Sequence, residues 1–308
     1  MWRRLEPWVL ALSIVGTTAC GGMQYVKPVK AFQEAMNSGL PAVRDYYLQI
    51  NEMERSRYVA TLAANPDLDL DEKDVRFSGV ISLKSLKARL DALKLVEVYA
   101  ARLAELASTD SPSQFKDKTE VLTGDLLNLG ATFSSLAGKG DSFKKATQYA
   151  GPVGSLVGLV GEIYLERQRD VALTKAIREA DGPVTAILQN MRDEFEAGLS
   201  EVVTTAMDEK FAAGVLAYSK ARKQLDVGGR QALLDSVVAA SKEYRDAIEA
   251  RPTDVIDAML KAHKAFVTFA ASKREPQNVA QLAVAIDAFT AHVKAFADAV
   301  QKMRGQED

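Results

Sequence analysis

The sequence predicts an all-α protein, an elongated bundle of about eight helices, several of them very long and most of them antiparallel. Three observations support this fold class. Ala, Leu, Lys and Glu are abundant in the 308 residues, and these residue types favour helices. Apolar residues recur mostly three or four positions apart, the spacing of one helix face. No segment alternates apolar and polar residues as a strand does, and no Asn-Gly or Asp-Gly turn separates β-rich runs.

Composition and charge indicate a folded chain and argue against several kinds of binding site. A hydrophobic content of 47% with 26% charged residues is typical of a folded chain. The net charge is -2, and without the net +1 of residues 1–19 it is about -3, which argues against a general nucleic-acid binder. Cys20 is the only cysteine in the sequence, which excludes intrachain disulfides and cysteine-rich metal sites.

Residues 1–19 have the layout of a secretory signal peptide. Arg3 and Arg4 form a short cationic start, an apolar run follows at 8–15, and small residues at 16–19 lead to Cys20. The apolar run is too short to span a bilayer, which takes about 20 residues. We expect no other run of span length in the rest of the chain.

The end of this leader, Thr17-Thr18-Ala19-Cys20, resembles the lipobox of bacterial lipoproteins, in which a small residue precedes a lipidated cysteine. Thr17 stands where that family usually has Leu. The resemblance covers about twenty residues and implies that Cys20 becomes the N-terminal residue and carries acyl chains such as palmitate, which anchor it in a lipid membrane. Gly21, in place of an inner-membrane-retaining Asp, implies an outer-membrane protein that faces the periplasm. The alternative is an ordinary cleaved signal with a chance cysteine.

The mature chain is expected to comprise a lipidated tether at 20–27 and a single all-helical domain at 28–304. Pro28 suits the first turn of a helix that ends at Asn65-Pro66, with an interruption at residues 38–41. An acidic connector follows at 66–80. Further helices are expected from Ser82, from Pro112 to about 137, at 152–180 and at 184–225, and then near 231–250, 254–272 and 278–303.

Four glycines mark one face of the predicted helix at 152–180. They are three, four and three residues apart: Gly151, Gly154, Gly158 and Gly161. Each glycine inside a helix costs about 1 kcal/mol relative to Ala, so a compensating role is expected. Tight packing under a crossing helix is our first interpretation, and a hinge or a membrane-active face is the alternative. Residues 150–161 are uncharged but too few to span a membrane.

Two other groups of residues were considered as metal sites and rejected. The acidic cluster at Asp67, Asp69, Asp71, Glu72 and Asp74 lacks the glycine and the final glutamate of an EF-hand loop, so a solvated loop is expected. The only histidines, His263 and His292, lie outside any HExxH or ExxH arrangement. We expect both to be half-buried or hydrogen-bonded structural residues.

No catalytic or cofactor motif is present, and neither a cofactor nor a metal is expected. The sequence contains no GxSxG, SxxK, P-loop or GxGxxG signature. Our first hypothesis is therefore a non-enzymatic, envelope-anchored protein that binds another envelope or secreted protein. The alternative is a membrane-active, pore-forming-like protein that rearranges around the glycine face at 151–161. An enzyme of unrecognised type is a third hypothesis.

Overall fold

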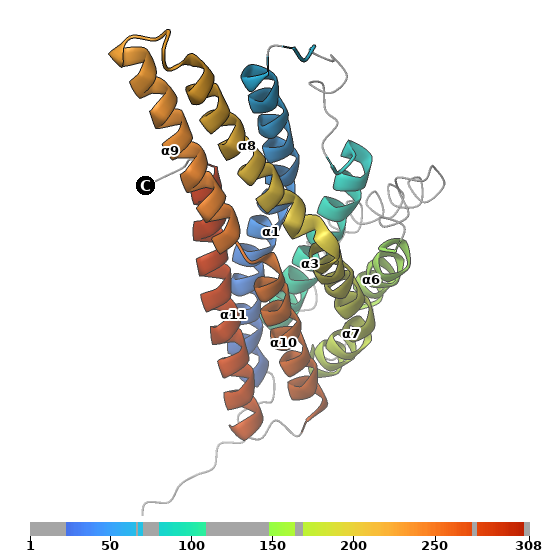
Figure 1. Ribbon diagram of the computed structural model, residues 1–308. Coiled ribbons are helices and arrows are strands. Elements are labelled where there is room, and N and C mark those ends of the chain that lie inside the picture. Colours follow the sequence, from blue (N-terminus) through green and yellow to red (C-terminus); the bar gives the residue numbers. More distant parts are fainter. Residues whose placement is uncertain are drawn as a thin grey trace, which may run out of the picture.

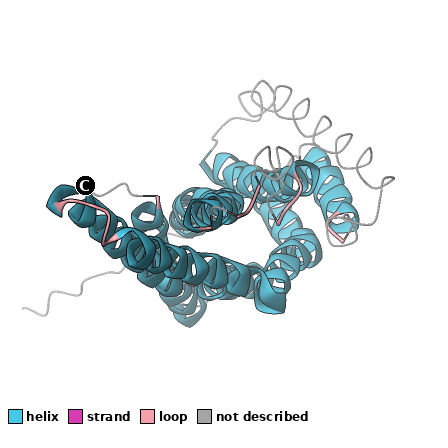
Figure 2. Cartoon of the chain, turned by 45° about the horizontal axis from the view of Figure 1, so that its top comes forward, coloured by secondary structure: helices cyan, strands magenta, loops and turns pink. Residues whose placement is uncertain are grey.

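The computed structural model describes residues 23–65, 67–69, 80–108, 148–163, 169–272 and 276–304. Within these ranges every regular element is a helix and none is a strand, which confirms the all-α class (Figure 2). The predicted signal peptide and Cys20, the expected helix at 112–137 and most of the acidic connector lie outside the described residues.

The first helix, α1, is the longest described element and the axis of the bundle (Figure 1). It runs from Met23 to Ala64, and its 42 residues correspond to a length of about 63 Å. The expected interruption at residues 38–41 is wrong, because α1 continues through both Pro28 and Pro41. Burial explains this continuity. Residues on both sides of Pro41, including Met36 and Tyr46, are fully buried, so packing outweighs the hydrogen bond that proline removes.

Four further helices form the main bundle together with α1. They are α3 (Leu83–Ser108), α7 (Arg169–Glu194), α10 (Pro252–Ala271) and α11 (Pro276–Met303). α3 and α11 both pack along α1, and α10 lies between α7 and α11. A shorter helix, α6 (Ala150–Ile163), packs on α7 and α3 at the edge of the bundle.

The remaining helices form a hairpin along the C-terminal half of α1. α8 spans Ser200–Ala221 and α9 spans Val227–Glu249. Asp226 caps α9, because its Oδ1 accepts a hydrogen bond of 2.7 Å from the amide of Gly229. Lys220 Nζ donates to the carbonyl of Ala64 at 3.1 Å, which joins the hairpin to the end of α1.

The expected division into about eight separate helices differs from the structure around residue 183. A helix end was predicted at 181–183, but α7 continues through Pro183. Leu173, Ile177, Val184 and Leu188 are fully buried on both sides of the proline, so the same packing argument applies.

The predicted uninterrupted helix at 184–225 contains a break of another kind. A π-helical turn, η2 (Phe195–Leu199), separates α7 from α8, and Gly198 within it has φ +120°. Only glycine adopts this backbone conformation readily, so Gly198 accounts for the position of the turn.

One buried cluster holds most of these helices together. It includes Val29 near the start of α1 and Met303 at the end of α11, with members from α3, α6, α7, α8, α9 and α10. Aromatic pairs belong to this cluster: the rings of Phe32 and Phe266 are stacked with centroids 5.1 Å apart, and those of Tyr47 and Phe195 are tilted with centroids 4.9 Å apart. These contacts join α1 to α10 and to the π-helical turn.

By length and composition, residues Gln277–Met303 of α11 are apolar enough to cross a membrane, and no other helix in the described part of the chain meets this criterion. This finding differs from the expectation of no further span-length run. The buried residues of α11, among them Leu282, Phe289 and Val293, repeat three and four apart and face α1 and α10. Alanines dominate its exposed side, so both sides of the helix raise its mean hydropathy.

Candidate functional site

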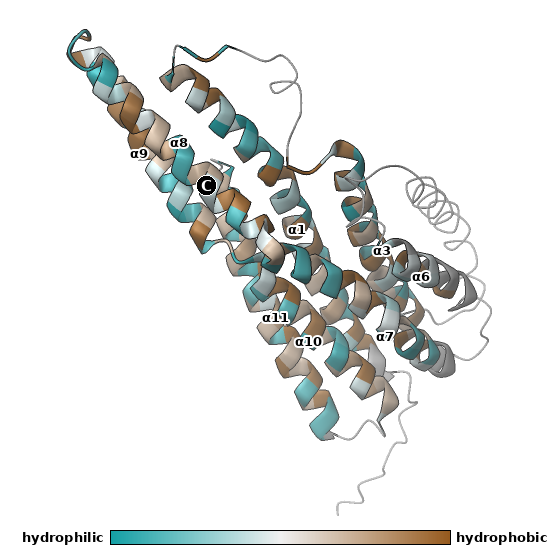
Figure 3. Cartoon of the chain, turned by 45° about the vertical axis from the view of Figure 1, so that its right-hand side comes forward, coloured by the Kyte–Doolittle hydropathy of each residue, from teal (hydrophilic) through white to brown (hydrophobic). Residues whose placement is uncertain are grey.

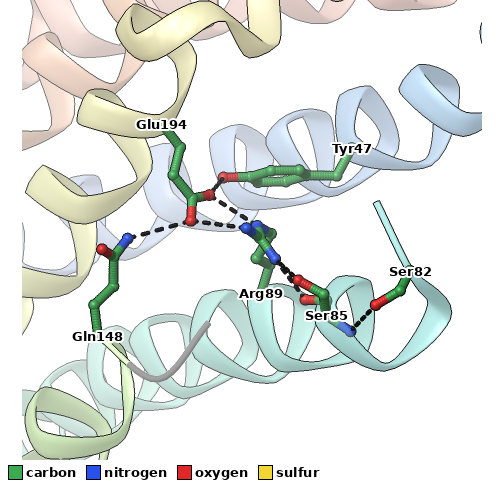
Figure 4. Close-up of polar contacts among 6 residues, drawn as sticks. All are labelled: Tyr47, Ser82, Ser85, Arg89, Gln148 and Glu194. Atoms are coloured by element: carbon green, nitrogen blue, oxygen red, sulfur yellow. Dashed lines mark hydrogen bonds and ion pairs between the residues drawn. The ribbon is translucent and has the colours of Figure 1, made fainter. Parts of the chain in front are cut away.

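A buried ion pair between Arg89 of α3 and Glu194, the last residue of α7, is the most elaborate polar arrangement in the described part of the chain (Figure 4). Only 6% of the Arg89 side chain and 4% of the Glu194 side chain are exposed. The pair is bidentate: Nε donates to Oε2 at 2.8 Å, and Nη2 donates to Oε1 at 2.8 Å. Two parallel charge-assisted hydrogen bonds fix both the distance and the orientation of the two helices.

Three other residues contribute polar groups to the pair. The hydroxyl of Tyr47, on α1, donates to Glu194 Oε2 at 3.3 Å. Nε2 of Gln148, just before α6, donates to Glu194 Oε1 at 3.2 Å. The third nitrogen of Arg89, Nη1, donates to the carbonyl and the hydroxyl of Ser85 one turn earlier. We call these five residues the Arg89–Glu194 cluster.

The electrostatics of the cluster follow from burial. Burial acts to lower the pKa of Arg89, but the Glu194 carboxylate outweighs it and raises that pKa. Burial raises the pKa of Tyr47 well above its ordinary value, and the negative charge of Glu194 adds to this effect. The pKa of the neighbouring Tyr149 is raised for the same two reasons. Both phenols therefore stay neutral over the physiological pH range.

The arrangement fits a structural lock better than a catalytic pair. Each oxygen of Glu194 already accepts two hydrogen bonds from groups of this chain, which leaves little capacity for a ligand. The cluster connects α1, α3, α7 and Gln148, which precedes α6. Its hydrogen bonds fix the positions of these segments relative to one another.

A second buried polar group, His263 of α10, contrasts with the first. It is 0% exposed and lies between the rings of Phe32 and Tyr99, whose centroids are 6.3 and 6.1 Å away. Neither ring nitrogen has a hydrogen-bond partner among the described residues, and the nearest carboxylate oxygen, Asp181 Oδ1, is 3.7 Å from Nε2. Burial lowers the pKa of His263 to about 4, although the negative charge of Asp181 opposes the shift.

The two histidines therefore differ from their predicted roles. His263 was expected to be half-buried or hydrogen-bonded, and it is neither: it is fully buried, and both ring nitrogens lack a partner among the described residues. His292 is exposed on α11. Among the described residues no group of three or more His, Cys, Asp or Glu side chains is placed to hold a metal ion.

The glycine face of α6 is open where it can be described. Gly151 and Gly154 lie at exposed positions, and no described atom lies within 4 Å of a Cβ built on either residue. No helix in the described part of the chain crosses over Gly154, and the expected packing under a crossing helix stays a prediction. Instead, α6 packs through Val153, Leu156 and Leu159. The surroundings of Gly158 and Gly161 lie outside the described residues.

Close helix packing occurs at Gly39, which lies where the sequence predicted an interruption of the helix at residues 38–41. A Cβ built on Gly39 would lie 2.8 Å from Cγ2 of Val293 on α11 and 3.2 Å from Cε of Met259 on α10. Gly39 thus allows α10 and α11 to approach α1. The acidic cluster of the connector is represented only by Asp67 and Asp69, which are both exposed; its other three members lie outside the described residues.

The sequence analysis missed the Arg89–Glu194 cluster, although a signal was present. Arg89 lies on the apolar stripe of its helix, three residues after Leu86 and four before Leu93. Glu194 likewise follows Met191 by three residues on the stripe of α7. One basic and one acidic residue on the apolar faces of different helices are a recognisable indication of a buried ion pair.

Comparisons of the chain with protein-family models, with curated proteins and with solved structures find no match.

Proposed function

We propose that this chain is a lipid-anchored envelope protein whose helical domain binds another envelope or secreted protein and catalyses no reaction. The proposed anchor is Cys20, in the outer membrane, with the domain facing the periplasm. The observation that carries the proposal is the short distance in sequence between this cysteine and α1. α1 begins at Met23, only three residues after Cys20.

This spacing has a geometric consequence for a lipidated chain. A lipidated Cys20 would hold the N-terminal end of α1 close to the membrane surface. Because α1 is about 63 Å long, its other end and the α8–α9 hairpin could then project by several tens of ångströms. A stiff helical rod that carries exposed side chains away from a membrane is suited to binding and scaffolding. The fully partnered Arg89–Glu194 cluster is compatible with such a role, because it stiffens the bundle without offering an open acid or base.

The anchor is tested by the mass of the mature N-terminus and by membrane fractionation. We expect acyl chains on Cys20 and recovery of the protein with the outer membrane, and we expect Cys20→Ser to release or mislocalise it. An unmodified Cys20, or cleavage at another residue, would contradict the anchor.

The binding role is tested by photo-crosslinking in cells. A photoreactive residue is placed at Val59, which is 50% exposed near the far end of α1. The matched position is Val279 on α11, beside the N-terminal half of α1. We expect a discrete adduct with another envelope or secreted protein from Val59 and a weaker one from Val279. The absence of an adduct from both positions would contradict the role.

A second candidate, a membrane-active protein, is favoured by one specific observation. Gly151 and Gly154 are exposed and uncovered by described residues, and residues 150–161 carry no charge. A helix with an open apolar face could leave the bundle and enter a bilayer. Dye release from liposomes by the wild-type protein, lost in Gly158→Leu without a lower melting temperature, would favour this candidate over the first.

A further inference from the structure

The α8–α9 hairpin extends beyond the main core of the molecule. We call residues 200–249 the arm, residues 211–234 its tip half, and residues 200–210 with 235–249 its base half. The base half contributes Val203, Met207 and Ala247 to the main core, whereas no residue of the tip half belongs to it. α8 packs on both α9 and α1; Gly214 of the tip half lies against Val237 of α9, and Lys220 reaches the end of α1.

The arm exposes aliphatic side chains on more than one side: Leu216, 44% exposed, shares the side of α8 that carries Glu209 and Lys220, and a larger group lies on other sides of the two helices. The side facing α1 is identified by Glu209, which accepts a hydrogen bond from Arg57 at 2.7 Å, and by Lys220, which reaches Ala64. Val215 lies on the other side of α8 and is 41% exposed. On α9 three further exposed residues, seven and four positions apart, share one face of the helix: Val227, Leu234 and Val238. We call these four residues the outer face of the arm.

Two valines of the outer face are largely exposed. Val227 is 73% exposed and Val238 is 68% exposed. Figure 3 shows hydrophobic residues at several positions along α9. A group of apolar side chains on one side of a projecting element indicates a surface that is covered by a partner.

Charge is segregated along the arm. The tip half contains Lys220, Arg222, Lys223 and Arg230 against Asp226, a net charge of +3. The base half contains seven acidic residues (Glu201, Asp208, Glu209, Asp235, Glu243, Asp246 and Glu249) against Lys210, Lys242 and Arg245, a net charge of -4. Some of these charges are already paired within the chain, Glu209 with Arg57 and Glu243 with Lys210. Arg222 and Lys223 at the tip, and Glu201 and Asp208 at the base, are all exposed.

We propose that the outer face binds the same face of a second copy of this chain, with the two arms antiparallel. This orientation places the basic tip half of each arm against the acidic base half of the other, whereas a parallel orientation would oppose like charges. The pairing is two-fold symmetric, so each exposed aliphatic residue is covered by the same surface of the partner. The product is a four-helix bundle made of two hairpins.

The size of the arm is sufficient for a stable dimer. The 22 residues of α8 correspond to a length of about 33 Å, and two helices side by side are about 20 Å wide. One face therefore has an area of about 650 Å², or about 1,300 Å² buried in total, within the range of specific interfaces. Antiparallel arms also place the N-terminal ends of the two α1 helices at opposite ends of the dimer, roughly 90 Å apart. Two copies that are both anchored through Cys20 in one membrane could therefore pair in this way only with their α1 helices lying along the membrane surface and not projecting from it.

A bilayer fits the same surface less well. The negative charge of the base half opposes an anionic membrane, and the outer face contains no aromatic residue of the kind that favours the membrane interface. The arm of a second copy of the chain is complementary in charge to both the tip half and the base half. This proposal does not depend on the proposed function, and its test uses only the purified chain.

Sedimentation velocity of the full chain over a range of protein and salt concentrations measures the pairing. We expect a monomer–dimer equilibrium that salt weakens, and a Kd raised at least tenfold by Val238→Asp. The matched control is Val284→Asp on α11, where the valine is 69% exposed, and it should leave the Kd unchanged. A wild-type protein that is monomeric at every concentration in low salt would overturn the proposal. So would a monomer that binds phosphatidylglycerol vesicles through Val238.

A charge exchange tests the complementarity. Arg222→Glu with Lys223→Glu changes the net charge of the tip half from +3 to -1, and Glu201→Lys with Asp208→Lys changes that of the base half from -4 to 0. Each variant alone should pair at least tenfold more weakly than the wild type, and an equimolar mixture of the two should pair more tightly than either variant alone. A mixture no tighter than its components would contradict the proposal.

Disulfide trapping tests the orientation. In a Cys20→Ser background, Asp208→Cys mixed with Arg222→Cys should form a mixed disulfide dimer faster than either variant alone. Faster homodimer formation by each variant would indicate parallel arms and overturn the antiparallel arrangement.

Discussion

The same residue types have opposite surroundings in the interior of the bundle and at its periphery. In the interior, Gly39 admits two neighbouring helices and Glu194 accepts four hydrogen bonds. At the periphery, Gly154 has no described neighbour within 4 Å, and Glu196 forms an exposed ion pair with Arg192. Residue type alone therefore says little about energetic importance. Burial decides it, because a buried group cannot replace a lost partner with water.

The ion pairs provide the largest expected difference between the two regions. We expect Glu194→Leu to lower the free energy of unfolding by about 3–5 kcal/mol, because Arg89 would remain buried without its counter-charge. Chemical denaturation measures the change. The double variant with Arg89→Leu should recover part of the loss, since no unpaired buried charge remains.

The control for this prediction lies two residues away. Glu196→Leu, which breaks an exposed pair, should leave the melting temperature nearly unchanged. An equal loss of stability in both variants would show that burial does not distinguish these carboxylates.

The buried histidine should make the stability of the protein depend on pH. In the folded state the pKa of His263 is about 4, against 6.5 when unfolded, so the unfolded chain takes up a proton first as the pH falls. The contribution of neutral His263 is complete above pH 6.5. It is lost progressively between pH 6.5 and 4, by about 3 kcal/mol in total.

Denaturation curves of the wild type and of His263→Met over this pH range measure the effect. The difference in stability between the two proteins should shrink, or change sign in favour of the variant, as the pH falls. His292→Gln, at an exposed position, should behave like the wild type. A His263→Met variant that follows the wild-type pH dependence throughout would contradict the prediction.

Substitution by alanine should have opposite effects on stability at Gly39 and at Gly154. At Gly39 a Cβ would lie 2.8 Å from Cγ2 of Val293, whose branched side chain cannot turn away easily. Gly39→Ala should therefore destabilise the protein by about 1–2 kcal/mol, even after the gain in helix propensity. Thermal denaturation measures it. A melting temperature at or above that of the wild type would show that α11 moves enough to accommodate the added methyl group beside Val293.

At the open position the sign reverses and the effect is smaller. Gly154→Ala places a methyl group where no described atom lies within 4 Å, and it removes the conformational freedom of an interior glycine. We expect a stabilisation of about 0.5–1 kcal/mol, measured as a higher melting temperature. A lower melting temperature would indicate that the glycine face is covered after all.

Several features of the fold were predictable because they depend on local chemistry. The stripe from Leu86 to Leu106 predicted α3, and Arg251-Pro252 correctly separated α9 from α10. The breaks predicted at Pro41 and Pro183 were wrong, because local propensity did not include the burial of their neighbours. The candidate site was only partly accessible: Arg89 and Glu194 are visible as charges on apolar stripes, but 105 residues separate them. Nothing in the spacing of either stripe indicates that the two side chains meet.

The sequence by itself determined the helical class and the apolar face of most helices, because spacings of three and four residues have only one regular interpretation. It also determined that Gly198 could adopt a conformation closed to other residues, although not that it does so. Tertiary structure decided that the helices continue through Pro41 and Pro183 and that Gly39 lies in close contact with neighbouring helices. It also decided which charges would meet in the interior. Each of these outcomes depends on side chains far apart in the chain, whose packing energy exceeds the local preference that it overrides.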